Sequence, residues 1–460
     1  MPTPTAAELA ARLDRLPGTR HVWRLVILIS LGACFEFYDL FLTAYVVPGM
    51  AKHGLFTPQS LGIFGILAPL KVAGPGTFVF ALFAGLWVGT MAFGWVADAY
   101  GRRSIFTFSL VWYCISTLIM AFQTTGFGID LWRFIAGIGI GVELVTIDTY
   151  ISELIPRHVR GRAFALNQFI AFCAVPVVAF LAWVLGPDNW RWVVVLGAVG
   201  AIFVWWLRLG VPESPRWLAR HGRLAEAEAI IARLEAEVQA EYGALPPLAA
   251  APAVEPREGA LAELWQPPYG GRTLLLSVFN FFQTFGYYGF AAWVPTLLIA
   301  KGINITTSLQ YAFIIAIANP VGPLLCTAIA DRIERKWQIC LAALGIGVFG
   351  LAFAFQTEPA LLILFGVLVT LSNNWLSYAF HGYQAELFPT RIRSRAVGFV
   401  YSWSRLSAAF SGLAVAFFLG VGGTEAVFGF IAVAMLIVIV SIGAFGPRTT
   451  NLALEAISHA

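Results

Sequence analysis

Two carboxylates stand in the first long apolar stretch of the chain. Glu36 and Asp39 are three residues apart, so they share one face if the stretch is a helix. Two close carboxylates in an apolar medium do not both ionise easily, so at least one of them is expected to hold a proton. The pair is therefore suited to carrying protons. The alternative is that each acid pairs with a base and only holds helices together.

A base that could pair with these acids lies in the fourth apolar stretch. Arg133 precedes a glycine run over residues 137–141, which would let another helix approach closely. From the rise per helical residue, Asp39 lies about 22 Å and Arg133 about 30 Å from the same end of a bundle, so their side chains could meet. We expect protonation of Asp39 to release Arg133. Glu143, on the same stretch, is a second candidate for carrying the proton.

A further arginine, Arg405, stands in the eleventh apolar stretch. From the rise per helical residue it lies about 14 Å from the cytoplasmic end of that helix, which is near the middle if the helix crosses a membrane. A guanidinium stays charged there and offers a fork of donors for a carboxylate. We expect it to anchor an anionic substrate; the alternative is a structural pair with Glu143 or Glu36. Amide and aromatic side chains that could complete such a site stand in the seventh, tenth and eleventh stretches: Gln283, Tyr287, Tyr288, Asn374, Tyr378 and Trp403.

The composition of the chain indicates a membrane protein. Of its 460 residues, 59% are hydrophobic and only 12% are charged, and the mean hydropathy is +0.78, whereas a soluble domain has about 25% charged residues. Each expected span is long enough to cross about 30 Å of hydrocarbon. Twelve spans are expected, at residues 24–48, 74–97, 105–123, 127–153, 163–186, 190–210, 273–298, 308–330, 337–356, 360–385, 396–420 and 424–446.

Short motifs repeat at a constant offset of 233 residues, so that Asp98 corresponds to Asp331 and Tyr150 to Tyr383. Motifs that share one offset indicate a duplicated half rather than chance similarity. The predicted fold class is an all-α membrane protein with 12 transmembrane helices in two pseudo-symmetric six-helix bundles around a cavity. Further pairs share the offset: Arg102 and Arg335, Glu153 and Glu386, Arg160 and Arg393.

The loops divide into a basic set and a nearly neutral set. Loops 2–3, 4–5, 8–9 and 10–11 are rich in arginine, whereas the opposite loops hold only Lys52, Lys71, Arg191 and Lys301. The positive-inside rule then places both termini and the central loop in the cytoplasm, with the spans in the inner or plasma membrane. The expected domains are a cytoplasmic N-terminal segment, a first bundle, a linker with amphipathic helices, a second bundle and a cytoplasmic tail, at 1–23, 24–210, 211–272, 273–446 and 447–460.

Two loops carry ordered motifs of glycine, acid, proline and arginine. Residues 94–103 read Gly-Trp-Val-Ala-Asp-Ala-Tyr-Gly-Arg-Arg, and residues 212–218 read Pro-Glu-Ser-Pro-Arg-Trp-Leu. Both resemble signatures of the major facilitator superfamily, in its sugar-porter-like and metabolite:proton symporter branch, including organic acid and nicotinate carriers and organic anion transporters. The resemblance implies secondary active transport by alternating access. It further implies that Asp39 is the proton site and that Gln168 contacts the substrate.

Two departures from the sugar porters bear on the substrate. The seventh span has Phe282-Gln283 where sugar porters have paired glutamines, and the tenth span has Ser377 to His381 where they have Gly-Pro and tryptophan. These departures argue against a sugar.

The resemblance also implies a cytoplasmic gate, in which charges of the two halves close the inner side of the outward-open state. Loop 8–9 departs, because Glu334 stands at the position of Gly101, and it is expected to be less tightly held. A network across both halves is needed, since one exposed ion pair contributes little. The matching positions are Asp98, Arg102, Arg103, Glu153, Arg160 and Glu213, with Asp331, Arg335, Glu386 and Arg393 in the second half.

These features predict proton-coupled uptake of a small organic anion, a carboxylate metabolite that could be aromatic. The expected partners are this substrate, protons and the lipid membrane, without nucleic acid, and the chain is expected to be a monomer. No phosphate-binding loop, metal-spaced histidine cluster or nucleophile motif occurs in the sequence, so neither an enzyme nor a cofactor is expected. The alternatives are proton-coupled efflux of a drug or organic cation, sugar or polyol symport, and a non-transporting sensor.

Overall fold

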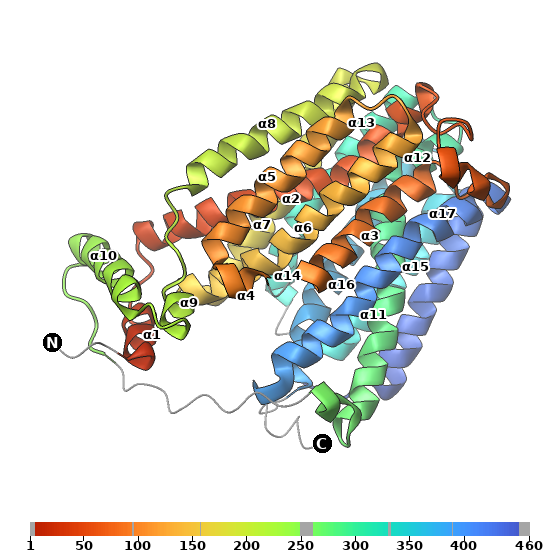
Figure 1. The fold of residues 1–460 in the computed structure, drawn as a ribbon. Helices are drawn as coiled ribbons and strands as arrows, with labels where there is room; N and C mark the ends of the chain where they lie inside the picture. The colour runs from red at the N-terminus through yellow and green to blue at the C-terminus, as the bar shows by residue number, and fades with distance from the viewer. Residues whose placement is uncertain are drawn as a thin grey trace.

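The computed structural model describes residues 5–93, 96–156, 158–248, 261–329, 333–388 and 390–449, and these residues form helices and connecting loops. Figure 1 shows the first six spans as one bundle. Their helices follow one another along the chain with short loops, as the apolar spans predict. The helices are α2 (Arg20–Lys52), α3 (Pro75–Phe93) with α4 (Val96–Tyr100), α5 (Arg102–Ala121), α6 (Gly126–Leu154), α7 (Arg160–Leu185) and α8 (Trp190–Arg208).

The second bundle lies beside the first (Figure 1). Two of its spans are broken into two helices, and its last two spans are joined as one element that turns at Gly422 and Gly423. Gly423 has a φ of 67°, a left-handed conformation that glycine adopts without strain. The helices are α11 (Tyr269–Ala291), α12 (Val294–Ala300), α13 (Ile305–Ala316), α14 (Ala318–Ile329), α15 (Arg335–Phe355), α16 (Pro359–Glu386) and α17 (Thr390–Val440).

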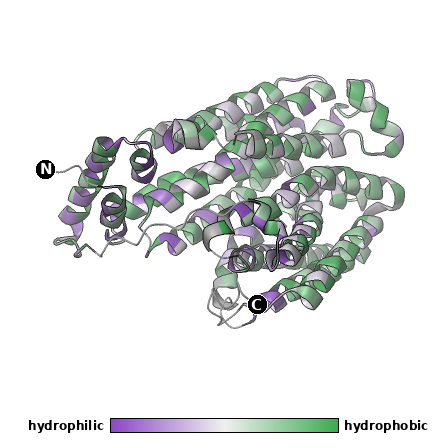
Figure 2. Ribbon diagram, turned by 60° about the horizontal axis from the view of Figure 1, so that its bottom comes forward, coloured by the Kyte–Doolittle hydropathy of each residue, from purple (hydrophilic) through white to green (hydrophobic). Residues whose placement is uncertain are grey.

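These elements account for twelve spans. Nine helices of the described residues pass a test of length and apolar composition for crossing a membrane, and the bent pair of η1 (Gly62–Leu70) and α3 makes a tenth. The joined α17 holds two spans rather than one. The twelfth is α11, whose 23 residues are long enough but include amides and tyrosines that lower its hydropathy. Figure 2 shows the prevalence of hydrophobic residues along the bundles.

Glycines bring α3 and α6 into close contact within the first bundle. A Cβ atom on Gly85 would lie 2.1 Å from the backbone oxygen of Phe134, and one on Gly137 would lie 2.4 Å from that of Leu82. The glycine run of the fourth span therefore serves close helix packing, as its composition indicates. This contact fixes the position of α6, which carries Arg133.

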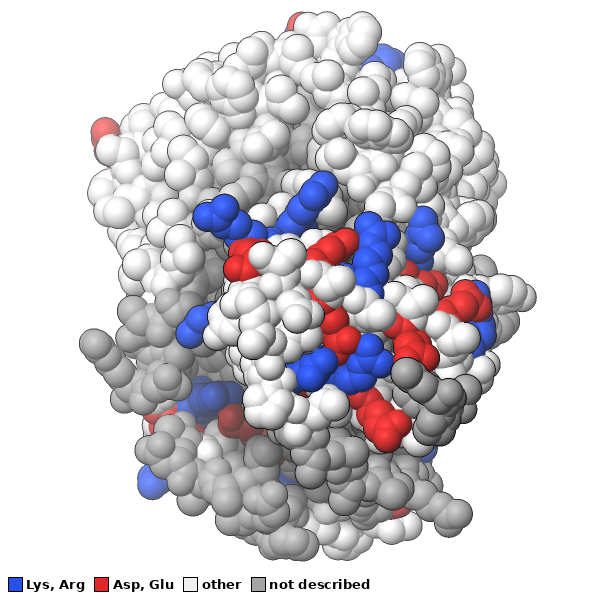
Figure 3. Space-filling model, turned by 90° about the vertical axis from the view of Figure 1, so that its left-hand side faces the viewer, with Lys and Arg blue, Asp and Glu red and all other residues white. Residues whose placement is uncertain are grey.

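A small helical module lies at one end of the first bundle. It consists of α1 (Ala6–Asp14), α9 (Pro215–Arg220) and α10 (Leu224–Tyr242). Glu235 of α10 bonds both Arg12 and Arg15 at 2.6 Å, and Asp14 lies 2.7 Å from Arg216 of α9. Figure 3 shows acidic and basic side chains interspersed over this face. We call this side of the molecule, with the loop around Arg102, the charged end.

Candidate functional site

A cavity of about 680 Å³ lies between the two bundles. Its wall reaches Gly161 near the start of α7 and Arg335 at the start of α15, both at the charged end, so the cavity opens toward that end. Side chains of α2, α6 and α7 form one side, and those of α11, α14, α15, α16 and α17 form the other. Aromatic and aliphatic walls with a few polar groups are typical of small-molecule sites.

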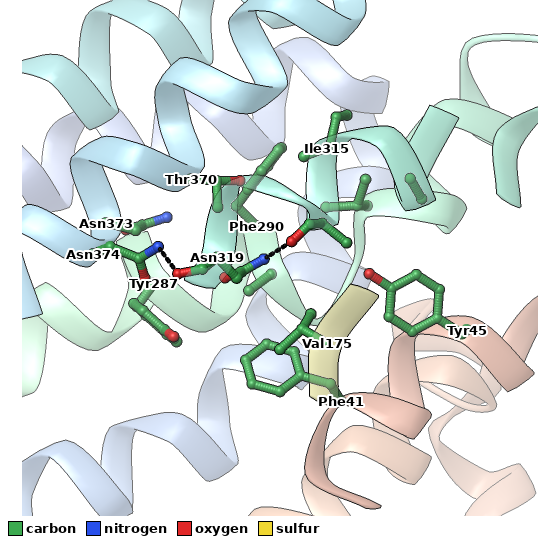
Figure 4. Close-up of a pocket in the computed structure, with 14 residues that line it drawn as sticks. Phe41, Tyr45, Val175, Tyr287, Phe290, Ile315, Asn319, Thr370, Asn373 and Asn374 are labelled. Atoms are coloured by element: carbon green, nitrogen blue, oxygen red, sulfur yellow. Dashed lines mark hydrogen bonds between the residues drawn. The ribbon is translucent and has the colours of Figure 1, made fainter. Parts of the chain in front are cut away.

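At the opposite end the two bundles contact each other. The Lys71 ammonium donates to the backbone oxygen of Gly420 at 2.6 Å, and the rings of Trp183 and Phe313 stack with centroids 5.7 Å apart. Between this contact and the large cavity lies a small pocket of about 20 Å³, which Figure 4 shows with residues of both bundles around it. Its polar lining comes from Tyr45, Tyr287, Asn319, Thr370, Asn373 and Asn374. This pocket is enough for about one water molecule.

The structure joins Asp39 to Arg133, as the helical rise predicts. One guanidinium nitrogen lies 3.0 Å from the Asp39 carboxylate, and the other donates to Thr43 at 2.6 Å. Thr117 of α5 donates to the second carboxylate oxygen at 3.2 Å. Both charged residues are almost fully buried, Asp39 being 4% exposed and Arg133 not at all. A buried pair of this kind costs desolvation energy and is strongly destabilised when one partner is removed.

The other two predicted acids lie in different surroundings. Glu36 lines the large cavity from α2, within electrostatic reach of Tyr288. Glu143 is fully buried in α6 and does not line the cavity among the residues that the structure describes. The three acids therefore occupy a buried pair, a cavity wall and a helix interface.

Arg405 lies on the cavity wall contributed by α17. Its guanidinium carbon is 4.9 Å from the centre of the Tyr401 ring, and the Tyr288 hydroxyl lies beside it. His381 of α16 is close enough to interact electrostatically with Arg405 and packs edge-on against Tyr401. This corner combines a fixed positive charge with aromatic faces, which suits a planar carboxylate.

Amides and hydroxyls continue the wall from α11 and α17. Gln283 donates to Ser404 at 3.1 Å, and Thr284 and Ser404 share a hydrogen bond of 2.7 Å. The cavity is also lined by four further predicted contacts, Gln168, Tyr287, Asn374 and Tyr378. Trp403 is not among the lining residues in the described part of the chain, because its helix turns Ser404 and Arg405 toward the cavity instead.

The predicted gate residues of the first half form a compact cluster. The Arg102 guanidinium makes two hydrogen bonds with Glu153, of 3.2 and 3.1 Å. Glu213 accepts the backbone N–H groups of Arg102 and Arg103 at the start of α5, where a helix favours an anion. Arg160 lies 3.7 Å from Asp14. The side chain of Asp98 lies outside the described residues.

The second half repeats part of this arrangement. Arg335 lies 2.6 Å from Glu386, and Glu334 accepts the backbone N–H of Thr449 at 2.9 Å. The equivalent tyrosines also make equivalent bonds: the Tyr150 hydroxyl donates to Pro212 and that of Tyr383 to Pro447. Asp331 and the side chain of Arg393 lie outside the described residues. The ion pairs described at this end lie within one half, in keeping with a cavity that is open there.

The sequence analysis did not single out Asp130, an acid in the first turns of α6. It is 1% exposed, so it is as buried as the predicted site residues. Its position three residues before Arg133, within an apolar span, is a signal that could have revealed it.

Two helical bundles around a cavity that opens toward one end are the arrangement typical of membrane transporters of the alternating-access class. The family model described as "Sugar (and other) transporter" matches residues 25–460. The chain belongs to this family, within the major facilitator superfamily, and is a transporter rather than an enzyme.

Relatives match over nearly the whole chain. The protein YyaJ of Bacillus subtilis, named for metabolite transport, is 31% identical and covers 96% of both chains. The inner membrane metabolite transport protein YdjE of Escherichia coli is 28% identical over 98% of both. The niacin transporter NiaP of Acinetobacter baylyi is 26% identical over 98% of this chain and 99% of its own. The xylose transporter XylE of E. coli, solved partially occluded and inward open, has the same fold, with a TM-score of 0.74, 20% identity and coverage of 95% of this chain and 100% of its own.

Proposed function

We propose that the protein takes up a small organic anion, a carboxylate metabolite with an aromatic ring among the candidates, together with protons. The observation that carries this proposal is Arg405 on the cavity wall, beside Tyr288 and under Tyr401. Its guanidinium would hold the carboxylate, and the tyrosine faces would hold an adjoining ring. Gln283 and Asn374 would supply hydrogen bonds to other polar groups of the substrate.

Proton coupling would use the buried pair of Asp39 and Arg133. When Asp39 is ionised, it neutralises the buried guanidinium at 3.0 Å. A proton on Asp39 would weaken this pair and change which arrangement of the first bundle is most stable. Glu36, which lies one turn away on α2 and faces the cavity, would exchange the proton with the open side.

The charged end would face the cytoplasm, because the arginine-rich loops gather there. The structure would then be the inward-facing state, with the substrate path open inside and closed outside. In the outward-facing state, the gate charges of the two halves would approach each other across the closed inner side. The described residues of this proposed gate are Arg102, Arg103, Glu153, Arg160 and Glu213 of one half and Arg335 and Glu386 of the other.

Two observations support other substrates. Glu36 on the cavity wall could attract an organic cation, and the amides of α11 and α16 could bind a sugar or polyol. Arg405 opposes the first, because a fixed positive charge repels a cation at close range. The name of one relative favours an acid, since the A. baylyi protein is a niacin transporter.

Purified protein in liposomes tests the proposal, with radiolabelled nicotinate as the acid. We expect nicotinate to accumulate under an inward acid gradient, and to leave again when a protonophore collapses the gradient. Nicotinamide, xylose and tetraethylammonium serve as neutral, sugar and cation comparators. Accumulation of a comparator while nicotinate and a panel of aromatic and aliphatic acids stay outside would contradict the anion assignment. A complete absence of flux would favour the non-transporting sensor.

A further inference from the structure

Asp130 is a buried acid without a described partner. Both of its carboxylate oxygens are shielded from solvent, and neither accepts a hydrogen bond from any residue that the structure describes. Thr77 at the start of α3 is its neighbour, but the Thr77 hydroxyl donates to the backbone oxygen of Gly74 at 2.9 Å. An ionised carboxylate in this setting is costly, so the present arrangement fits a neutral, protonated Asp130.

Arg133 has a buried N–H group that could bond the Asp130 carboxylate. Its Nε is buried and bonds no described residue, although its other two nitrogens bond Asp39 and Thr43. Asp130 and Arg133 are three residues apart on α6, so they share a helix face. The Arg133 guanidinium also lies 5.6 Å from the ring centre of Phe78, the residue after Thr77, so both side chains adjoin the same turn of α3.

We infer that Asp130 is a second counter-ion for Arg133 and that the arginine alternates between two carboxylates. In the arrangement seen, Arg133 pairs with ionised Asp39 and Asp130 holds the proton. In the other arrangement, the proton sits on Asp39 and Arg133 pairs with ionised Asp130. Asp39 gains one proton as Asp130 loses one, so each arrangement holds one cation, one carboxylate and one neutral acid.

This exchange removes a physical difficulty of the proposed proton coupling, on which it rests. Protonation of Asp39 alone would strand a fully buried guanidinium without a counter-ion, which is strongly destabilising. A second acid on the same helix face keeps the charge paired in both arrangements. Asp130 also lies in the second turn of α6, near the helix N-terminus, where the helix dipole favours an anion.

Other ionisable groups near that end of the first bundle have partners of their own. Lys52 lies 2.8 Å from Asp188, and Arg191 donates to the backbone oxygens of Ala121 and Gln123. Among the described residues, Thr77 of α3 lies beside Asp130, while Thr43 of α2 and Thr117 of α5 bond the pair of Arg133 and Asp39. The exchange is thus confined to one arginine and two acids.

Thermal unfolding of the full chain in detergent tests the inference and needs no substrate. The variants are Asp39→Asn, Asp130→Asn and the double variant. Each single variant leaves Arg133 one acid, whereas the double leaves none, so we expect the double to lower the melting temperature by several degrees more than the sum of the singles. Asp39→Asn with Glu143→Gln is the matched control, because Glu143 is equally buried on α6, and its effects should add.

A third substitution keeps the test decisive if the double variant does not fold. Arg133→Met removes the stranded charge, so adding it to the double should restore the melting temperature, or restore folding itself. Additive single effects, or a double that Arg133→Met does not rescue, would overturn the inference. Because no flux is measured, these outcomes are independent of the nicotinate experiment: loss of transport with a non-additive cycle would refute the proposed function and leave the arginine exchange standing.

Discussion

The two bundles bury different kinds of polar group. The first bundle buries carboxylates at Glu36, Asp39, Asp130 and Glu143, together with Arg133. The second buries mainly amides and hydroxyls, such as those of Asn280 and Gln283, and no carboxylate of its described residues is buried. Carboxylates can gain and lose protons, whereas amides can only orient and hydrogen-bond a ligand. If the proposed function holds, the duplicated fold would separate proton handling from substrate binding.

Arg405 brings a positive charge to the part of the cavity wall that the second bundle forms. It lies on the wall of a cavity that both bundles line. A substrate bound there would touch both halves. Under the proposed function, the anion of the substrate and Glu36 of α2 would share this cavity.

The largest effect on transport is expected at the buried carboxylates of the first bundle. Asp39→Asn removes the ionisable partner of Arg133, and we expect accumulation of nicotinate under an acid gradient to fall to the level of protein-free liposomes. The measurement is gradient-driven uptake. Asp188→Asn, an exposed acid outside the spans, is the control and should accumulate normally. Full accumulation by Asp39→Asn would remove proton handling from this pair.

Substitution of Arg405 tests the substrate side. Loss of a charge-assisted hydrogen bond costs about 1.5–3 kcal/mol, so Arg405→Ala should weaken acid binding roughly 10- to 100-fold. Arg405→Lys should recover part of the loss, because it keeps the charge without the planar fork. Binding is measured by the ligand-induced rise in melting temperature. Unchanged acid affinity in Arg405→Ala would refute the anchor, and Arg223→Ala on the exposed module serves as the control.

The ion pairs of the two gate clusters differ in burial, and removing them should have a smaller effect than the substitutions above. The Arg102 and Glu153 side chains are 7% and 11% exposed, whereas those of Arg335 and Glu386 are 33% and 21% exposed. Glu153→Gln leaves a buried guanidinium without its carboxylate and should cost about 2 kcal/mol, whereas Glu386→Gln should cost less than about 1 kcal/mol. Melting temperatures of the two variants check this order. Equal losses would show that the two halves hold their loops equally tightly.

Much of this arrangement could be predicted from the sequence. Apolar length located the spans, and rise per residue brought Asp39 to Arg133 across two helices. Helix rotation was harder, because a span that is apolar all round gives no signal for the side that faces a cavity. Trp403 was therefore expected to contact substrate, although the structure turns Ser404 and Arg405 of the same helix inward.

Features that depend on long-range contacts stayed out of reach. The breaks between α11 and α12 and between α13 and α14 each come just before a proline, Pro295 and Pro320, so the sequence held a signal for them although the spans were predicted as continuous. The approach of Asp14 to Arg216, which are 202 residues apart, depends on how the module docks. Asp130 was missed for a different reason, since it stands near the start of its span, where an acid is expected to face water.

The smallest effect concerns the module at the charged end. Burial opposes ionisation of Glu235, but hydrogen bonds from Arg12 and Arg15 outweigh it and hold the pKa of Glu235 below its ordinary value of 4.5. A carboxylate whose pKa is lowered by folding adds stability that is complete above the unfolded pKa and is lost as pH falls through the folded one. The melting temperature of Glu235→Gln should therefore lie below that of the natural chain at pH 7, and the two should converge at pH values below the folded pKa. A gap that persists there would mean that packing of α1 on α10, rather than charge, holds the module, in contrast to the buried charges of the first bundle.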